Sequence, residues 1–190
     1  MIFPLEAKLP WINHFAFGRL KTLIRPDFRV LEFGSGGSTL FFKDHTAYVY
    51  SIEHDAKWFE NVKSKCQDTD KVELNLLQPE IDPEAQVEYK SINGMFTKGL
   101  SYKKYSHGAD HLPDESFDLL LIDGRARPKC LKNSISKLKP GGILVFDNSD
   151  RESYQPVIST LLKGWKSEVY QGVTIYDAFF NQTTLFFKPA

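Results

Sequence analysis

The 190-residue sequence has few cysteines, no excess of charge of either sign and no long apolar run. Cys66 and Cys130 lie far apart and lack the spacing of a zinc or redox site, so we expect two buried free thiols. Lysine plus arginine and aspartate plus glutamate both number 24, which argues against a field that attracts nucleic acid or anionic lipid. No run approaches the roughly 18 apolar residues that cross a membrane. We therefore expect a cytoplasmic protein, monomer or homodimer, whose partner is a small molecule rather than nucleic acid or membrane.

The apolar residues that are present suffice for one complete hydrophobic core. They make up 42% of the chain, and 14% of all residues are aromatic. A chain of this length forms one domain of ordinary size. We therefore expect residues 1–190 to be a single domain, without a second independent unit.

Helix-like and strand-like segments alternate from residue 10 to residue 163, which is typical of a parallel sheet with helices on both faces. The expected strands are 29–33, 48–53, 72–77, 117–123 and 142–147. The expected helices are 10–25, 38–43, 56–67, 130–138 and 153–163. Two last strands, 167–170 and 183–187, have no helix between them and are expected to pair as an antiparallel hairpin at the sheet edge. The prediction is an α/β fold with a seven-stranded, mostly parallel sheet.

Two segments flank this alternating core. Residues 1–25 are expected to form an N-terminal cap whose helix ends near Arg25, because Pro26 disfavours helical geometry in the residue before it. Residues 79–109 fit no helix or strand well and carry several aromatic side chains. So long a stretch inside a compact domain is typical of a functional loop, and we expect it to form a lid over a ligand site.

A glycine-rich turn, Glu32-Phe33-Gly34-Ser35-Gly36-Gly37-Ser38-Thr39, joins the first expected strand to a helix. Glycines let the backbone approach a ligand, and the helix start offers N–H groups to a carboxylate, although a turn without a ligand uses the same residues. Glu32 would repel a pyrophosphate but suits ammonium and sulfonium groups, unless it only caps the loop amides. Glu53 follows about twenty residues later, the spacing of an acid that binds ribose hydroxyls in adenosine-containing ligands, NAD included.

Four motifs in this order and spacing, over residues 28–148, resemble those of the class I S-adenosylmethionine-dependent methyltransferases: VLEFGSGGSTL, SIEHD, FDLLLIDG and LKPGGILVFDN. The resemblance implies a Rossmann-like fold, S-adenosyl-L-methionine as cofactor, and a lid and acceptor side formed by residues 1–25 and 79–109. NAD-binding domains have no counterpart of the Leu138–Gly142 turn. The implied cofactor contacts are Glu32, Gly34, Ser35, Gly36, Ser38, Glu53, His54, Asp110 and Asp123, with Glu53 at the ribose and Asp110 at the adenine.

The acids that follow the fourth and fifth strands allow two interpretations. Asp123, Asp147 and Asn148 resemble the magnesium site of catechol-type O-methyltransferases, and an all-oxygen set suits a hard cation. Arg125 and Arg127 favour the metal-free alternative, because two guanidinium groups would compete with a divalent cation. These arginines, with Asn148, are candidates for binding an acidic group of the acceptor, unless they pair with neighbouring carboxylates.

Methyl transfer from a sulfonium needs alignment and a dry pocket more than acid–base help. If a base acts, the candidates are Asp123, Tyr105 and His111. The sequence therefore predicts O- or N-methylation of a small molecule. Three alternatives remain open: a magnesium-dependent catechol-type enzyme, an NAD-dependent oxidoreductase, and a non-catalytic module that binds an adenosine ligand.

Overall fold

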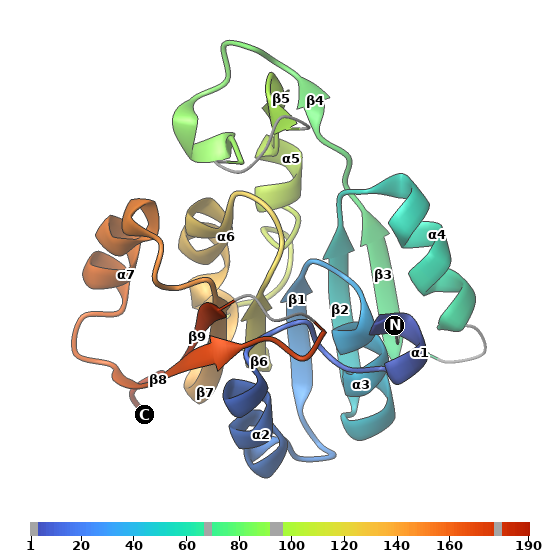
Figure 1. The fold of residues 1–190 in the computed structure, drawn as a ribbon, viewed down its shortest axis with the longest axis vertical. Helices are drawn as coiled ribbons and strands as arrows, with labels where there is room; N and C mark the ends of the chain where they lie inside the picture. Colours follow the sequence, from blue (N-terminus) through green and yellow to red (C-terminus); the bar gives the residue numbers. More distant parts are fainter. Residues whose placement is uncertain (1–3, 67–69, 92–96, 177–179) are drawn as a thin grey trace.

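A computed structural model describes residues 4–66, 70–91, 97–176 and 180–190. Seven strands form one sheet in the order β3-β2-β1-β6-β7-β9-β8 (Figure 1). The strands are β1 (Arg29–Phe33), β2 (Tyr48–Glu53), β3 (Val72–Leu76), β6 (Phe117–Ile122), β7 (Leu138–Asp147), β8 (Lys166–Val173) and β9 (Phe180–Phe187). The first five run parallel, and β9 pairs antiparallel with both β7 and β8. The predicted α/β fold with its antiparallel edge hairpin is confirmed.

Helices cover both faces of the sheet. The helices are α1 (Pro4–Ala7), α2 (His14–Leu23), α3 (Gly37–His45), α4 (Ala56–Lys65), α5 (Lys103–Ser106), α6 (Arg127–Ser134) and α7 (Gln155–Leu161). Side chains of α2 and α3 pack on one face, where Leu119 and Leu121 of β6 point. Side chains of α6 and α7 pack on the other face, where Leu120 and Ile122 point. The near-continuous apolar run of β6 follows from this two-sided burial.

The N-terminal helix starts later than its sequence pattern predicts. The structure begins α2 at His14 rather than at Pro10, because the Asn13 side chain accepts hydrogen bonds from the N–H groups of Phe15 and Ala16, at 2.9 and 3.2 Å. The asparagine thereby supplies the N-cap that an α-helix needs. The helix ends at Leu23, so the predicted end at Arg25 is two residues late.

Helix α6 and strand β7 both begin earlier than predicted. Helix α6 begins at Arg127 rather than residue 130, with Pro128 in its first turn, a position where the missing N–H of proline costs nothing. A 3-10 turn, Ile135–Lys137, then leads into β7. Strand β7 already starts at Leu138, which pairs with Phe117 beyond an irregularity in the β6–β7 ladder. The Pro140-Gly141-Gly142 turn therefore lies within the strand rather than before it.

The segment 79–109 contains short elements where the sequence predicts none. Strands β4 (Glu80–Ile81) and β5 (Leu100–Ser101) form a separate antiparallel pair beyond the end of the main sheet (Figure 1). A 3-10 turn, Val87–Tyr89, is tied to α6 by an ion pair between Glu88 and Lys129 at 2.8 Å. Residues 92–96 of the predicted lid lie outside the described residues.

The two cysteines are free, as predicted, but only Cys130 is buried, whereas Cys66 is half-buried at the end of α4. Within the described ranges, no helix has both the length and the apolar character needed to cross a membrane. The helix expected over 56–67 ends at Lys65, and residue 67 is not among those described.

Replacing Asn13 with alanine removes the N-cap of α2 while leaving its backbone in place. We expect the free energy of unfolding to fall by about 1 kcal/mol. Urea denaturation measures this loss. Asn13→Ser is the matched control, because serine retains a side-chain oxygen that can cap the helix, and it should lose clearly less stability than the alanine variant. Equal losses in both variants would contradict the capping role.

Candidate functional site

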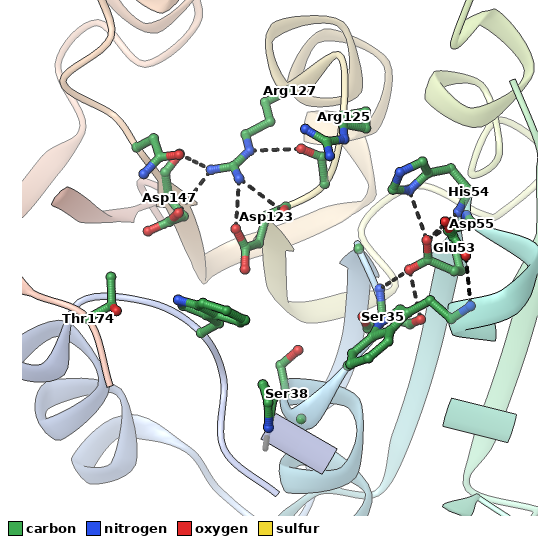
Figure 2. Close-up of a pocket in the computed structure, with 18 of the residues that line it drawn as sticks. Ser35, Ser38, Glu53, His54, Asp55, Asp123, Arg125, Arg127, Asp147 and Thr174 are labelled. Atoms are coloured by element: carbon green, nitrogen blue, oxygen red, sulfur yellow. Dashed lines mark hydrogen bonds and ion pairs between the residues drawn. The ribbon is translucent and has the colours of Figure 1, made fainter. Parts of the chain in front are cut away.

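A cavity of about 820 Å³ opens at the carboxyl ends of β1, β2, β6 and β7. This is the edge where open α/β sheets bind ligands. Most residues predicted to form the site line this cavity together: Gly34, Ser35, Gly36, Ser38, Glu53, His54, Asp123, Arg125, Arg127, Asp147 and Asn148. Figure 2 shows Glu53, His54 and Asp55 on one side of the cavity and Asp123, Asp147 and Thr174 on the other.

The glycine-rich turn lies between two other parts of the backbone. Gly34 has φ +98°, and a Cβ atom there would lie 3.0 Å from the Cα of Gly124, so the turns that follow β1 and β6 touch. A Cβ atom on Gly37 would lie 2.2 Å from the carbonyl oxygen of Leu9 and 2.5 Å from that of Pro4. The N-terminal segment therefore lies directly over the start of α3, and both glycines serve close backbone contact.

Glu53 joins the glycine-rich turn to the end of β2. Its side chain is 2% exposed. One carboxylate oxygen accepts from the N–H and hydroxyl of Ser35, both at 2.9 Å, and the other from the N–H groups of His54 and Asp55, at 2.7 and 2.8 Å. Burial alone would raise the pKa of Glu53, but the hydrogen bonds and charge of His54 and the Asp55 amide lower it below its usual value. A ribose hydroxyl would join or replace one of these four bonds.

Glu32 lies beneath the turn and does not line the cavity. One of its oxygens accepts hydrogen bonds from the hydroxyls of Thr39 and Ser51, and the Thr39 hydroxyl in turn accepts from the N–H of Gly36. Burial raises the pKa of Glu32 to about 7, against the lowering effect of the hydroxyls around it. In this structure Glu32 supports the turn through Thr39 rather than facing a ligand.

Arg127 links the end of β6 to the end of β7, and every N–H donor of its guanidinium group takes part (Figure 2). Nε donates to the carbonyl of Gly124 at 3.0 Å. Nη1 donates to the carbonyl and the carboxylate of Asp147 at 2.6 and 3.0 Å, and Nη2 to those of Asp123 at 3.1 and 2.8 Å. Because arginine has five N–H donors, none is left for an acidic acceptor. Arg127 therefore pairs with neighbouring carboxylates and does not offer a donor to an acidic group of the acceptor.

The surroundings of Asp123 shift its pKa strongly. Burial, and then the charge of Asp147, raise the pKa of Asp123 well above its usual value, against the opposing charge of Arg127. Burial alone would lower the pKa of Arg127, but Asp123 and Asp147 raise it overall. Arg127 therefore stays charged, and Asp123 is a stronger base than an exposed aspartate.

The predicted magnesium ligands do not fit a cation. The Arg127 guanidinium contacts both Asp123 and Asp147, so a positive group already occupies the space between the two carboxylates. The Asn148 side-chain oxygen accepts from Arg151 instead of facing that space. Across the described part of the chain, no group of three or more His, Cys, Asp or Glu side chains is arranged to hold a metal ion.

Three further candidates lie away from the cavity lining. Tyr105 is fully buried behind Gly124, where a Cβ atom would lie 1.8 Å from the tyrosine hydroxyl. His111 lies with its Nε2 atom 3.2 Å from the hydroxyl of Tyr50. Asp110 pairs with His107 at 2.7 Å, on the outer side of this region. Of the predicted bases, only Asp123 reaches the cavity.

Sequence reasoning missed several cavity residues: Pro4, Trp11, Trp58, Thr174, Phe180 and Asn181. Trp58 donates from its indole N–H to the carbonyl of Ser35 at 2.7 Å, and Asn181 donates to Asp147 at 2.9 Å. Most of them come from the N-terminal segment and the edge hairpin, which no motif links to the glycine-rich turn. Asp55 also lines the cavity, and it caps α4 by accepting from the N–H of Trp58.

No family model matches the sequence, and a search of curated proteins finds no match to it. Solved structures share its fold. Precorrin 8W decarboxylase from Methanobacterium thermoautotrophicum has a TM-score of 0.60 at 15% identity over 100% of both chains. An rRNA methylase from Streptococcus thermophilus has a TM-score of 0.59 at 14% identity, over 92% of this chain and 95% of that one. Fibrillarin from Aeropyrum pernix, with natively bound S-adenosyl-L-methionine, has a TM-score of 0.56 at 15% identity, over 86% and 67%. The chain therefore shares the fold of these structures, which is the Rossmann-like fold that its motifs predict.

Removing the Arg127 side chain leaves the buried Asp147 and the half-buried Asp123 without their cation. We expect Arg127→Ala to lower the free energy of unfolding by about 3–5 kcal/mol, as for other buried ion pairs that lose one partner. Chemical denaturation at neutral pH measures the loss. The matched control is Arg125→Ala, which removes a half-buried arginine two residues away and should change stability by about 0.5 kcal/mol or less. Similar small losses in both variants would contradict the structural role of Arg127.

The raised pKa of Glu32 gives stability a defined pH dependence. Because the carboxyl titrates at about 7 in the folded protein but near 4.5 when unfolded, its contribution is complete below about pH 4.5 and is lost as pH rises through 7. The glutamine of the Glu32→Gln variant does not titrate. The free energy of unfolding of this variant, relative to that of the unchanged protein, should therefore rise by about 1–3 kcal/mol between pH 5 and pH 8. Urea denaturation at both pH values measures this difference. The control Glu60→Gln, at an exposed acid, should show no such rise, and a flat difference for Glu32→Gln would refute the assignment.

Proposed function

We propose that this chain is an S-adenosylmethionine-dependent methyltransferase that methylates a small molecule by in-line transfer. One observation carries the proposal: a single cavity holds the glycine-rich turn and acids at one end and, at the other, the half-buried Asp123, whose pKa is raised. That arrangement suits a charged adenosine cofactor and an acceptor side by side. The rRNA methylase and fibrillarin structures support it at the level of the fold.

The residues at the Glu53 end fit the cofactor. The start of α3 offers the N–H groups of Gly37 and Ser38 to the carboxylate of the amino-acid part. Glu53 and Asp55 offer oxygens to ribose hydroxyls, and both line the cavity. Gly36 has no Cβ atom, and the Trp58 ring lies about 3.8 Å from where that atom would be. The turn therefore presents a flat surface to the cofactor. The bound cofactor would supply an electrophilic methyl group.

The remaining side chains of the cavity exclude water and orient the acceptor. Trp11 and Phe180 add apolar walls at the Asp123 end. Asp123, held by Arg127, is the one predicted base that reaches this end, so it is the proposed proton acceptor when the acceptor must lose a proton. Arg127 provides the local positive charge beside Asp123, so the proposed transfer calls on no metal ion there.

The structure weighs against the other functions that the sequence left open. The antiparallel hairpin β8–β9 at the sheet edge is not expected of an NAD-binding domain. A non-catalytic module would leave no space for an acceptor, but the cavity continues past Asp123 to Thr174 and Asn181. Some structures with this fold are RNA methylases. The zero net charge favours a small molecule over RNA.

Calorimetric titration tests the cofactor. We expect S-adenosylmethionine and S-adenosylhomocysteine to bind in the presence of EDTA, and NAD not to bind. Glu53→Ala should weaken binding of both sulfur ligands by about 1–3 kcal/mol, because hydrogen bonds to the ribose and the turn are lost. Glu60→Ala, an exposed acid on α4, is the control and should bind as the unchanged chain does. Binding of NAD with no response to either sulfur ligand would overturn the proposed function.

A further inference from the structure

The end of the cavity opposite the glycine-rich turn has its own set of lining residues. We call this end the acceptor half. It consists of Trp11, Asp123, Asp147, Asn148, Thr174, Phe180 and Asn181. Its residues come from the N-terminal segment, from the ends of β6 and β7, and from the edge hairpin.

One carboxylate oxygen of the acceptor half faces the cavity. Asp123 pairs through one oxygen with Arg127, while its second oxygen points into the cavity (Figure 2). Asn181 donates from its NH₂ group to Asp147 at 2.9 Å, and its amide oxygen is fully buried, out of reach of a ligand. A ligand that donates a hydrogen bond would satisfy the second oxygen of Asp123.

The charges at this end are also unbalanced. Asp123 and Asp147 share the single guanidinium of Arg127, so these three groups carry one net negative charge when both acids are ionised. Arg125 lies nearer His54, on the side where Glu53 and Asp55 provide the opposing charge (Figure 2). The acceptor half thus favours a group that becomes positive and disfavours one that must first become an oxyanion.

We propose, resting on the proposed function, that the methyl acceptor is an amine whose nitrogen donates to Asp123. The free oxygen of Asp123 takes one proton from the bound ammonium group and passes it to solvent. The lone pair of the resulting neutral amine forms the new N–CH₃ bond while the S–CH₃ bond breaks, and that bonding pair stays on sulfur, which becomes a neutral thioether. The nitrogen becomes cationic in the same step. The product leaves as the methylated ammonium ion, so the net reaction releases one proton.

The walls of the acceptor half suit an amine on an apolar or aromatic body. Trp11 is 49% exposed and Phe180 is 83% exposed, although both line the cavity. Large aromatic side chains exposed at the mouth of a cavity are typical of a binding surface. Aromatic rings also attract ammonium groups through their faces. The substrate class is therefore an arylalkyl or similarly apolar amine.

Paired ligands on the unchanged protein test this inference. The probes are 2-phenylethylamine, 2-phenylethanol and 3-phenylpropionate, with the corresponding indolyl and cyclohexyl sets, titrated into protein saturated with S-adenosylhomocysteine. We expect at least one amine to bind about tenfold or more tightly than its alcohol and its carboxylate, as a charged hydrogen bond would provide. If no amine binds more tightly than its alcohol, the inference is overturned while the proposed function stands. If S-adenosylhomocysteine itself does not bind, both fail.

A variant pair tests the part played by Asp123. Asp123→Asn keeps an oxygen for Arg127 but presents an NH₂ group to the cavity, so we expect kcat with the amine to fall about 100-fold. Affinity for S-adenosylhomocysteine and the thermal midpoint serve as the folding check. Asp114→Asn, at an exposed acid paired with Lys137, is the control and should retain activity. An Asp123→Asn variant that binds S-adenosylhomocysteine normally and methylates the amine at the original rate would overturn the role of Asp123.

Discussion

The five hydrogen bonds of the Arg127 guanidinium are the interaction on which the ligand-binding edge of the sheet depends. Parallel strands end at this edge with backbone carbonyls and acidic side chains facing one another, and two carboxylates so close together repel. A rigid, planar and permanently charged group resolves both problems, because it satisfies carbonyls and carboxylates at once. The position of Asp123, and with it the chemistry of the acceptor half, follows from this one side chain.

Most of the fold could be predicted because its signals are local. The alternation of apolar segments predicts a parallel sheet covered by helices on both faces, and the missing helix between β8 and β9 predicts the antiparallel hairpin. The glycine-rich turn and Glu53 also meet in the structure as their spacing predicts. The misplaced start of α2 shows the limit of periodicity, since the Asn13 side chain rather than Pro10 decides where that helix begins.

The rest of the site depends on contacts between distant parts of the chain. Trp11 and Asn181 lie far from the central motifs in sequence, and only the folded chain brings them into the same cavity as Asp123. Tyr105 looks like a catalytic residue by type, yet the missing side chain of Gly124 allows its ring to fill the core behind the turn. The two arginines stand close together in the run Asp123-Gly124-Arg125-Ala126-Arg127. Nothing in that run tells which arginine turns inward.

The contact of Gly37 with the backbone of the N-terminal segment has a consequence for protein engineering. The atoms nearest the missing Cβ are the carbonyl oxygens of Leu9 and Pro4, which every amino acid carries. A library that varies side chains at those two positions therefore contains no compensating partner for a larger residue at position 37. Directed evolution that seeks to widen this end of the cavity must change the length of the leading segment instead, through insertions or deletions between residues 4 and 12.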